Sequence, residues 1–149
     1  MRVLITGGGT GIGRACAESL AEDGADVIIC GRTLETLEIA SEEIQAAHNT
    51  KVEYLICDVT EEESVEECLA KAAGSLKSLD GVVANAGGAV GLGSYESLNA
   101  DQYLDTLKLN VLGTIMATHV LTNSDERIKE KINNIDTYEC LENLNKIKL

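Results

Sequence analysis

Residues 3–13 read Val-Leu-Ile-Thr-Gly-Gly-Gly-Thr-Gly-Ile-Gly, so an apolar stretch runs directly into a glycine-rich one. The apolar part predicts a buried strand at Arg2–Thr6, and the residues after the glycines predict a helix at Ile12–Asp23. Glycine lets the chain turn tightly and lets a ligand approach the backbone, where the free N–H groups of a helix start attract an anion. The stretch therefore predicts a phosphate-binding turn; the alternative is a tight corner without a ligand.

Strands and helices are expected to alternate through the first 120 residues. Apolar runs typical of buried parallel strands follow at Asp26–Cys30, Val52–Cys57 and Leu79–Ala84. Because short connections between such strands require right-handed crossovers, we expect an α/β fold with a doubly wound parallel sheet of the Rossmann type. The expected strand order is 3-2-1-4, and a nucleotide would lie where this order reverses, above strands 1 and 4.

Three further helices are expected around these strands. The first has Thr33 as its N-cap, and the second has Thr60 as its N-cap and extends to Lys77. The third is expected from about Ala100 to His119.

The composition changes near residue 121, since the residues after it include no glycine, alanine or valine. We therefore expect one domain at 1–120, truncated relative to a complete sheet, and a divergent tail at 121–149. In the tail, Asn123 with Glu126 fits a helix cap, and isoleucines follow at helical spacing. The tail is thus expected to be helical.

Charge and cysteine content exclude several partners. The formal net charge is −13, which would repel nucleic acid and an acidic membrane surface. No apolar run approaches the ~20 residues that span a bilayer. The five cysteines, at positions 16, 30, 57, 68 and 140, include no C-x-x-C pair, so we expect neither a metal site nor a disulfide framework. Such cysteines fit a reducing cytoplasm.

The glycines follow the pattern T-G-x-x-x-G-x-G, in which Gly7, Gly11 and Gly13 occupy the glycine positions. Asp58 follows the third expected strand, and the triplet N-A-G at 85–87 follows the fourth. In these residues the chain resembles the short-chain dehydrogenase/reductase family over about residues 2–120. The resemblance implies hydride transfer between a nicotinamide dinucleotide and a carbonyl or alcohol. The residues that it places at the cofactor are Gly7, Gly9, Thr10, Gly11, Ile12, Gly13, Asp58, Val59, Asn85, Ala86 and Gly87.

Two family positions also have a local interpretation. The resemblance places Asp58 beside the adenine ring, but the side chain could equally cap the helix expected near Thr60, and both roles can coexist. Asn110 matches the family's active-site asparagine, which supports a proton relay near the catalytic lysine. Without the family, Asn110 is a helical residue hydrogen-bonded to a kinked carbonyl, since asparagine is unfavourable inside a helix.

The choice of cofactor depends on the end of the second strand. NAD selection needs a carboxylate there to accept from the ribose hydroxyls, whereas the 2′-phosphate of NADP needs a cation. The sequence offers Arg32 after Cys30 and Gly31, so we expect NADP rather than NAD. The alternative is that Arg32 is a solvated loop residue.

The family's catalytic serine, tyrosine and lysine have no counterpart in this sequence. The family lowers the pKa of its tyrosine with a lysine four residues later, whereas Tyr138 is followed by Glu142. Three hypotheses stay open: an NADP-dependent oxidoreductase, a dinucleotide-binding module without activity, and a truncated fragment without function. A bare apolar edge at Leu79–Ala84 would favour association, and the resemblance implies a homo-oligomer through the Asn110 helix.

Overall fold

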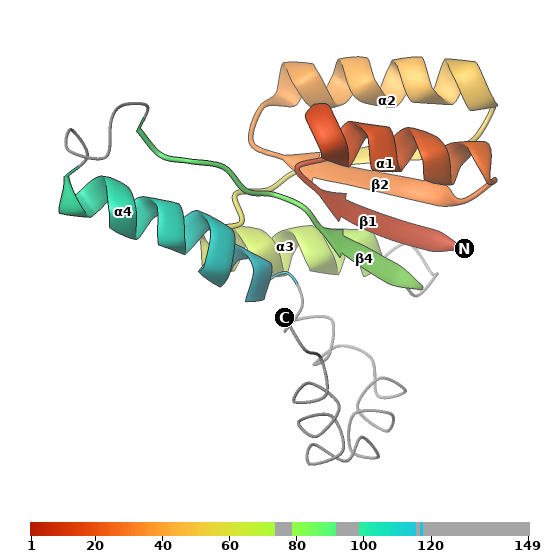
Figure 1. The fold of residues 1–149 in the computed structure, drawn as a ribbon. Helices are drawn as coiled ribbons and strands as arrows, with labels where there is room; N and C mark the ends of the chain where they lie inside the picture. The colour runs from red at the N-terminus through yellow and green to blue at the C-terminus, as the bar shows by residue number, and fades with distance from the viewer. Residues whose placement is uncertain (74–78, 92–98, 116, 118–149) are drawn as a thin grey trace, which may run out of the picture.

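The computed structural model describes residues 1–73, 79–91, 99–115 and 117, and it contains a parallel sheet with helices on both faces (Figure 1). The strands are β1 (Arg2–Thr6), β2 (Asp26–Gly31), β3 (Val52–Ile56) and β4 (Gly81–Ala84). Their order is β3-β2-β1-β4, and all three neighbouring pairs are parallel. The predicted α/β fold and strand order are therefore confirmed. The predicted tail at 121–149 lies outside the described residues.

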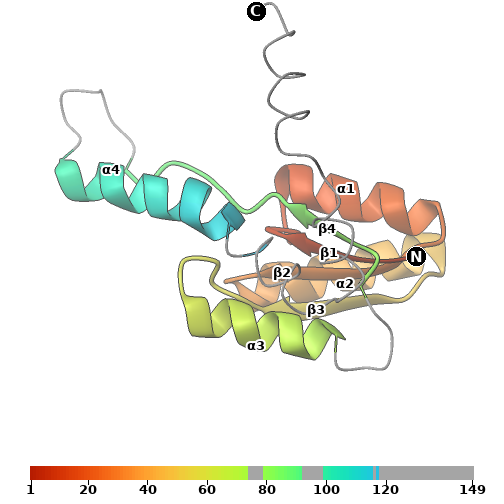
Figure 2. The same cartoon turned by 90° about the horizontal axis from the view of Figure 1, so that it is seen from below.

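The helices form two layers around the sheet. Helices α1 (Gly11–Glu22) and α2 (Leu34–His48) cover one face, and α3 (Glu62–Ala73) covers the other (Figure 2). Helix α4 (Ala100–Leu107) continues into a π-helical segment, η2 (Lys108–Leu112). Among the described residues, no helix combines the length and the apolar character needed to cross a membrane.

Side chains alternate between the faces of each strand, and this makes two separate cores. The strand residues of the core under α1 and α2 are aliphatic: Val3, Ile5, Val27, Ile29 and Val52. The core under α3 mixes aliphatic side chains with thiols: Leu4, Ile28, Cys30, Cys57, Val59, Val65, Cys68, Leu69 and Ala72. Because full burial of a large aliphatic side chain contributes about 2 kcal/mol, both cores hold the helices firmly against the sheet.

Of the two predicted N-caps, Thr33 is confirmed in position and Thr60 is not. Thr33 is the N-cap residue of α2, but its side chain makes no capping hydrogen bond; instead the Thr36 hydroxyl donates to the Thr33 carbonyl at 2.9 Å. The prediction that Thr60 caps α3 is wrong, because α3 begins at Glu62. The amide and hydroxyl of Thr60 donate to Asp58 Oδ1, at 2.9 and 2.7 Å, and this charged acceptor holds the residue in the preceding turn. The predicted extension of α3 to Lys77 lies outside the described residues.

The predicted helix from Ala100 is confirmed at its start and modified in its middle. Asn99 and Gln102 form a reciprocal capping box, in which each side chain accepts the other's backbone N–H at 3.0 Å. The π-helical segment η2 interrupts the α-helical pattern around Asn110. Asn110 Nδ2 donates to the Thr106 carbonyl at 2.7 Å, where the Asn110 backbone N–H would donate in an α-helix. The side chain thus compensates for the altered backbone pattern.

Candidate functional site

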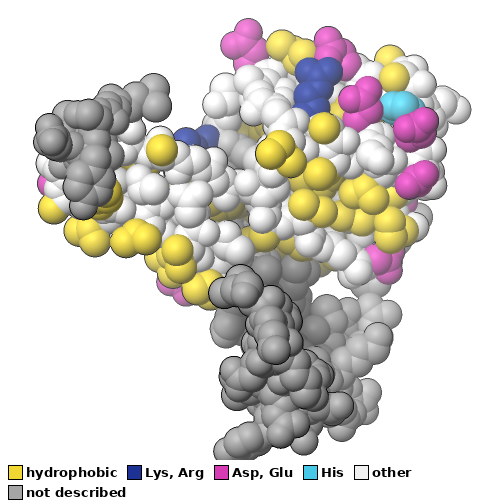
Figure 3. Space-filling model, in the orientation of Figure 1, with side chains coloured by type: hydrophobic (Ala, Val, Ile, Leu, Met, Phe, Trp, Pro, Cys, Tyr) yellow, Lys and Arg dark blue, Asp and Glu magenta, His cyan; other side chains and the backbone are white. Residues whose placement is uncertain are grey.

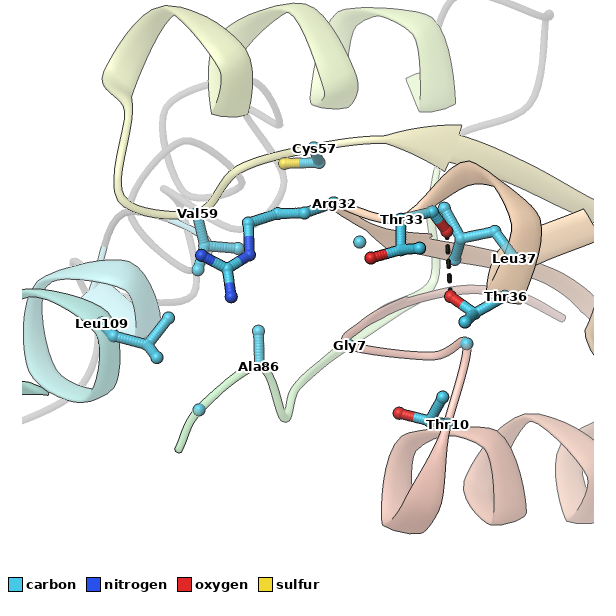
Figure 4. Close-up of a pocket in the computed structure, with 13 residues that line it drawn as sticks. Gly7, Thr10, Arg32, Thr33, Thr36, Leu37, Cys57, Val59, Ala86 and Leu109 are labelled. Atoms are coloured by element: carbon cyan, nitrogen blue, oxygen red, sulfur yellow. Dashed lines mark hydrogen bonds between the residues drawn. The ribbon is translucent and has the colours of Figure 1, made fainter. Parts of the chain in front are cut away.

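A groove of about 190 Å³ opens at the carboxyl ends of the four strands (Figure 4). In open α/β sheets this edge binds ligands at the point where the strand order reverses. Each strand contributes lining residues from its end or from the segment after it, and η2 contributes one more. The lining residues are Gly7, Gly9, Thr10, Gly31, Arg32, Thr33, Thr36, Leu37, Cys57, Val59, Ala86, Gly87 and Leu109.

The glycine turn after β1 presents backbone to the groove. Gly7 and Gly11 have φ angles of +67° and +55°, in the left-handed region that a side chain disfavours. Helix α1 begins at Gly11, and the side chain of its N-cap residue Thr10 makes no capping hydrogen bond. The first N–H groups of α1 are therefore not capped by Thr10 and can bind an anion. Ile12 is exposed in the same turn of helix.

Gly13 controls how closely α1 approaches the glycine turn. A Cβ atom at Gly13 would lie 2.3 Å from the Gly7 carbonyl oxygen and 2.5 Å from Asn85 Nδ2. No side chain fits at these distances, so the helix reaches this position only with glycine. Gly13 is buried, and these distances give it a packing role beneath the glycine turn.

A hydrogen-bond network joins the ends of β1 and β4. The Thr6 hydroxyl accepts the backbone N–H groups of Asn85 and Ala86, at 3.0 and 2.9 Å. Asn85 Nδ2 donates to the Thr6 carbonyl at 3.1 Å and to the Gly7 carbonyl at 3.4 Å. The amide side chain thus satisfies backbone groups of the glycine turn, and it fixes the turn against the segment that follows β4.

Arg32 supplies a positive charge inside the groove. Its side chain extends from the end of β2 across the groove toward Val59, and the guanidinium faces the open space above Ala86 (Figure 4). Within the described part of the chain, Arg32 makes no ion pair shorter than 4.0 Å. The guanidinium therefore keeps its planar set of donors for a bound anion.

Asp58 holds the turn between β3 and α3. Its Oδ1 accepts two hydrogen bonds from Thr60, and its backbone N–H donates to the Ser64 hydroxyl at 2.9 Å. Burial opposes ionisation, but the hydrogen bonds from Thr60 and the charges of Arg32 and Lys108 together lower the pKa of Asp58. These hydrogen bonds agree with the capping interpretation of Asp58 in one respect only. The groups that Asp58 binds belong to Thr60, in the turn before α3, and not to the helix itself.

Asn110 connects η2 to the segment after β4. Its Oδ1 accepts the Gly88 N–H at 3.0 Å, and its Nδ2 donates to the Gly88 carbonyl at 2.6 Å. A Cβ atom at Gly87 would lie 2.7 Å from Asn110 Oδ1, so glycine is needed for this approach. The interpretation of Asn110 as a helical residue bonded to a kinked carbonyl is confirmed by its bond to Thr106. Asn110 itself does not line the groove, but Gly88, which it binds, follows the lining residue Gly87.

The structure brings the predicted cofactor residues together at one edge of the sheet. The predicted residues that line the groove are Gly7, Gly9, Thr10, Arg32, Val59, Ala86 and Gly87. The others, apart from Ile12, adjoin lining residues in the chain or pack against them: Gly11, Gly13, Asp58, Asn85 and Asn110. Ile12 is exposed in the first turn of α1. Tyr138, which Glu142 follows four residues later, lies outside the described residues.

Sequence reasoning missed several lining residues: Gly31, Thr33, Thr36, Leu37, Cys57 and Leu109. Gly31, Thr33 and Cys57 could have been found, because they stand at or just after the end of a predicted strand. Leu37 and Leu109 reach the groove through the packing of α2 and η2, and no local pattern marks them.

Comparison with known proteins decides the family. A family model described as short chain dehydrogenase matches residues 1–144. The chain belongs to this family. It is 32% identical over 135 residues to the L-fucose dehydrogenase of Oryctolagus cuniculus, covering 91% of the chain and 46% of the relative. It is 34% identical over 115 residues to the 2,5-dichloro-2,5-cyclohexadiene-1,4-diol dehydrogenase of Sphingobium indicum, covering 76% and 44%. The chain thus spans less than half the length of these curated relatives.

Solved structures of the family share the fold. The alcohol dehydrogenase from the archaeon Thermococcus sibiricus, complexed with 5-hydroxy-NADP, has a TM-score of 0.77 at 31% identity, covering 85% of this chain and 54% of that one. An NAD⁺-bound xylitol dehydrogenase has a TM-score of 0.76 at 26% identity, covering 82% and 46%. These two neighbours hold different nicotinamide dinucleotides, so the likeness does not choose between NADP and NAD.

Proposed function

We propose that this chain binds a nicotinamide dinucleotide in the groove and prefers NADP to NAD. The observation that carries the preference is the Arg32 guanidinium, which faces the groove without an ion pair inside the described chain. A 2′-phosphate is a dianionic partner for its planar donors, whereas the ribose hydroxyls of NAD need an acceptor. The dinucleotides bound to solved relatives support the cofactor class.

The groove residues fit the parts of such a cofactor. The pyrophosphate would lie at the uncapped start of α1, against the backbone of Gly9, Gly11 and Ile12. The adenosine half would lie between Arg32 and the segment at Asp58 and Val59, as in the family. The nicotinamide half would lie over Ala86 and Gly87, which leave room because neither carries a large side chain.

The family reaction is a hydride transfer between the nicotinamide and a carbonyl or alcohol carbon, and the bound cofactor would supply or accept that hydride. Asn110 would act here as a positioning residue, because its side chain is engaged by Gly88 and Thr106. It holds the segment after β4 under the nicotinamide half.

Binding without turnover is the second candidate function of these 149 residues. None of the four tyrosines in this sequence, at 54, 95, 103 and 138, is followed four residues later by a lysine. A phenol with an ordinary pKa of about 10 needs a nearby cation to act as an acid–base group near neutral pH. The nicotinamide absorbance during incubation with ketones separates the two candidates, because only turnover consumes NADPH.

Titration of NADPH and NADH, followed by nicotinamide fluorescence, tests the proposal. We expect NADPH to bind more tightly, and Arg32→Ala to weaken NADPH binding about tenfold to 100-fold, since a charged hydrogen-bonding partner contributes about 1.5–3 kcal/mol. NADH binding should not change. Arg14→Ala is the matched control, because Arg14 pairs with Glu43 away from the groove. Equal binding of both cofactors by the unmodified chain would refute the NADP preference.

The same chain is proposed to form a homo-oligomer through α4 and η2. Figure 3 shows hydrophobic side chains along the edge of the α4 lobe. The large apolar side chains exposed in these segments and just after them are Tyr103, Leu104, Leu107, Val111, Leu112 and Ile115. The net charge of −13 makes two copies of the chain repel each other over most of their surfaces. The apolar strip is therefore the surface through which two copies can associate. Sedimentation should show a dimer that Leu107→Glu dissociates and Ile39→Glu, an exposed apolar position on α2, does not. A monomer of the unmodified chain would refute this interface.

A further inference from the structure

Three cysteines from distant parts of the chain meet in the core under α3. Cys30 is in β2, Cys57 follows β3, and Cys68 lies in the middle of α3. Their Sγ atoms all lie within 4.8 Å of one another, and the residues are only 0, 3 and 2% exposed. Three sulfurs around one metal ion, at a metal–sulfur distance near 2.3 Å, would be about 4 Å apart. The cluster is therefore almost at the spacing of a three-sulfur ligand set.

A small cavity of about 10 Å³ lies beside the thiols, bordered by all three of them. A cavity of this size holds about one water-sized atom, so the space suits a single ion and no larger ligand. The rest of the lining is aliphatic apart from Thr6 and the backbone. The Thr6 hydroxyl already accepts two backbone N–H groups, and so it is a poor fourth ligand.

The charge of the bound centre decides which ion fits. Structural zinc takes four protein ligands, whereas the described cavity offers three sulfurs. Three thiolates around a divalent or monovalent ion also leave negative charge in an apolar cavity, and burying an unpaired charge is costly. A trivalent centre bound to three thiolates is neutral. Trivalent arsenic is thiophilic and three-coordinate, so it matches both the number of sulfurs and the apolar surroundings.

We propose that Cys30, Cys57 and Cys68 form a binding site for trivalent arsenic, taken up as arsenous acid. The three thiols lose their protons as three As–S bonds form and three As–OH bonds break. Three water molecules leave, arsenic stays trivalent, and no oxidant or reductant takes part. The site needs free thiols, and all three cysteines are free in the structure. A reducing compartment such as the cytoplasm would keep them so.

One of the three thiols borders the large groove. Cys57 lines this groove, whereas Cys30 and Cys68 do not (Figure 4). Arsenous acid in the groove would therefore meet Cys57 first and then the two deeper thiols.

The position of Cys57 couples the arsenic site to the groove, a consequence that rests on the proposed cofactor function. Arsenic bound at Cys57 changes the groove wall and thereby the affinity for the cofactor. By thermodynamic linkage, the bound cofactor changes the affinity for arsenic by the same factor. The arsenic site itself does not depend on cofactor binding, so its test is carried out on the chain alone.

The test adds arsenite to the reduced full-length chain and measures native mass and arsenic X-ray absorption. We expect one arsenic per chain, a mass increase of one arsenic atom less three hydrogens, and three sulfur neighbours with no oxygen neighbour. The double variant Cys16→Ser with Cys140→Ser is the control; it should bind as the unmodified chain does, because the cluster within the described residues already supplies three sulfurs. Cys68→Ala, introduced into this double variant, should lose binding at the concentration that saturates the control.

The X-ray absorption of the unmodified chain keeps the test decisive even where Cys68→Ala fails to fold. A mixed sulfur and oxygen shell, an unchanged mass, or binding that the double variant abolishes would each overturn the proposal. Zinc or copper that binds in preference to arsenite, in competition at equal concentration, would overturn the assignment to a trivalent centre.

Discussion

The two ends of the groove are built in different ways. At one end, the glycine turn and the start of α1 form a site from backbone atoms of consecutive residues, with Gly13 fixing the approach of the helix. At the other end, one side chain, that of Asn110, connects η2 to Gly88 across 22 residues of sequence. The first end is rigid because its geometry is local and closely packed. The second end is held by a few exposed hydrogen bonds, and it is therefore the end at which the groove can open.

The largest effect is expected at the glycine turn. Gly13→Ala would place Cβ 2.3 Å from the Gly7 carbonyl oxygen, and the backbone must move to relieve this contact. We therefore expect the unfolding free energy to fall by about 3 kcal/mol and cofactor binding to be lost. Gly11→Ala is the matched control. No atom lies within 4 Å of its added Cβ, so only the backbone strain of its positive φ, about 1 kcal/mol, is expected. Urea unfolding measures both, and equal losses would contradict a packing role for Gly13.

A smaller effect is expected at the Asn110 end. Asn110→Ala removes the bonds to Gly88 and Thr106, and because the site is exposed, we expect a loss of about 1.5 kcal/mol in unfolding free energy. Hydrogen exchange at the Gly88 amide should become faster. Asn99→Ala, which destroys the capping box of α4, should cost about 1 kcal/mol and leave Gly88 protected. Unchanged exchange at Gly88 in Asn110→Ala would show that this end does not depend on the asparagine.

A pH-dependent effect is expected between the two ends, at Asp58. Its pKa is lowered in the folded chain, so its stabilisation is present above the unfolded value of about 3.9 and is lost as the pH falls through the folded pKa. Unfolding free energy should therefore fall as the pH drops through this range. Thr60→Val, which removes the hydroxyl donor, should reduce this dependence, and Thr60→Ser should keep it. An identical acid profile for the two variants would contradict the assigned cause.

The smallest effect is expected at the ion pair between η2 and the turn before α3. Lys108 Nζ lies 2.9 Å from Glu61 Oε1, and both side chains are exposed. A double-mutant cycle with Lys108→Gln and Glu61→Gln should give a coupling of about 0.5 kcal/mol that salt removes. The exposed pair Lys71–Glu67 within α3 is the reference. A coupling above about 1.5 kcal/mol would mean that the Asn110 end is held by charge as well as by hydrogen bonds.

Much of the fold and part of the site could be predicted because their signals are local. Apolar runs such as Val3–Ile5 and Val27–Cys30 mark strands, and the glycine spacing marks the turn, since each depends on neighbours in the chain. The cap at Thr60 was predicted wrongly because the local pattern did not show that Asp58 would accept hydrogen bonds from both donors of Thr60. The π-helical segment around Asn110 has no sequence signal comparable to a glycine turn.

The sequence by itself determined the order of strands and helices, the glycine turn at the start of α1, and the cation at the end of β2. These features follow from side-chain periodicity and from the conformational freedom of glycine, which act over a few residues. Only the tertiary structure decided that Thr6 would bind the segment after β4, that Asn110 would hold Gly88, and that three separated thiols would meet. These contacts join residues far apart in the chain, and they exist only after the sheet has brought the ends of its strands to one edge.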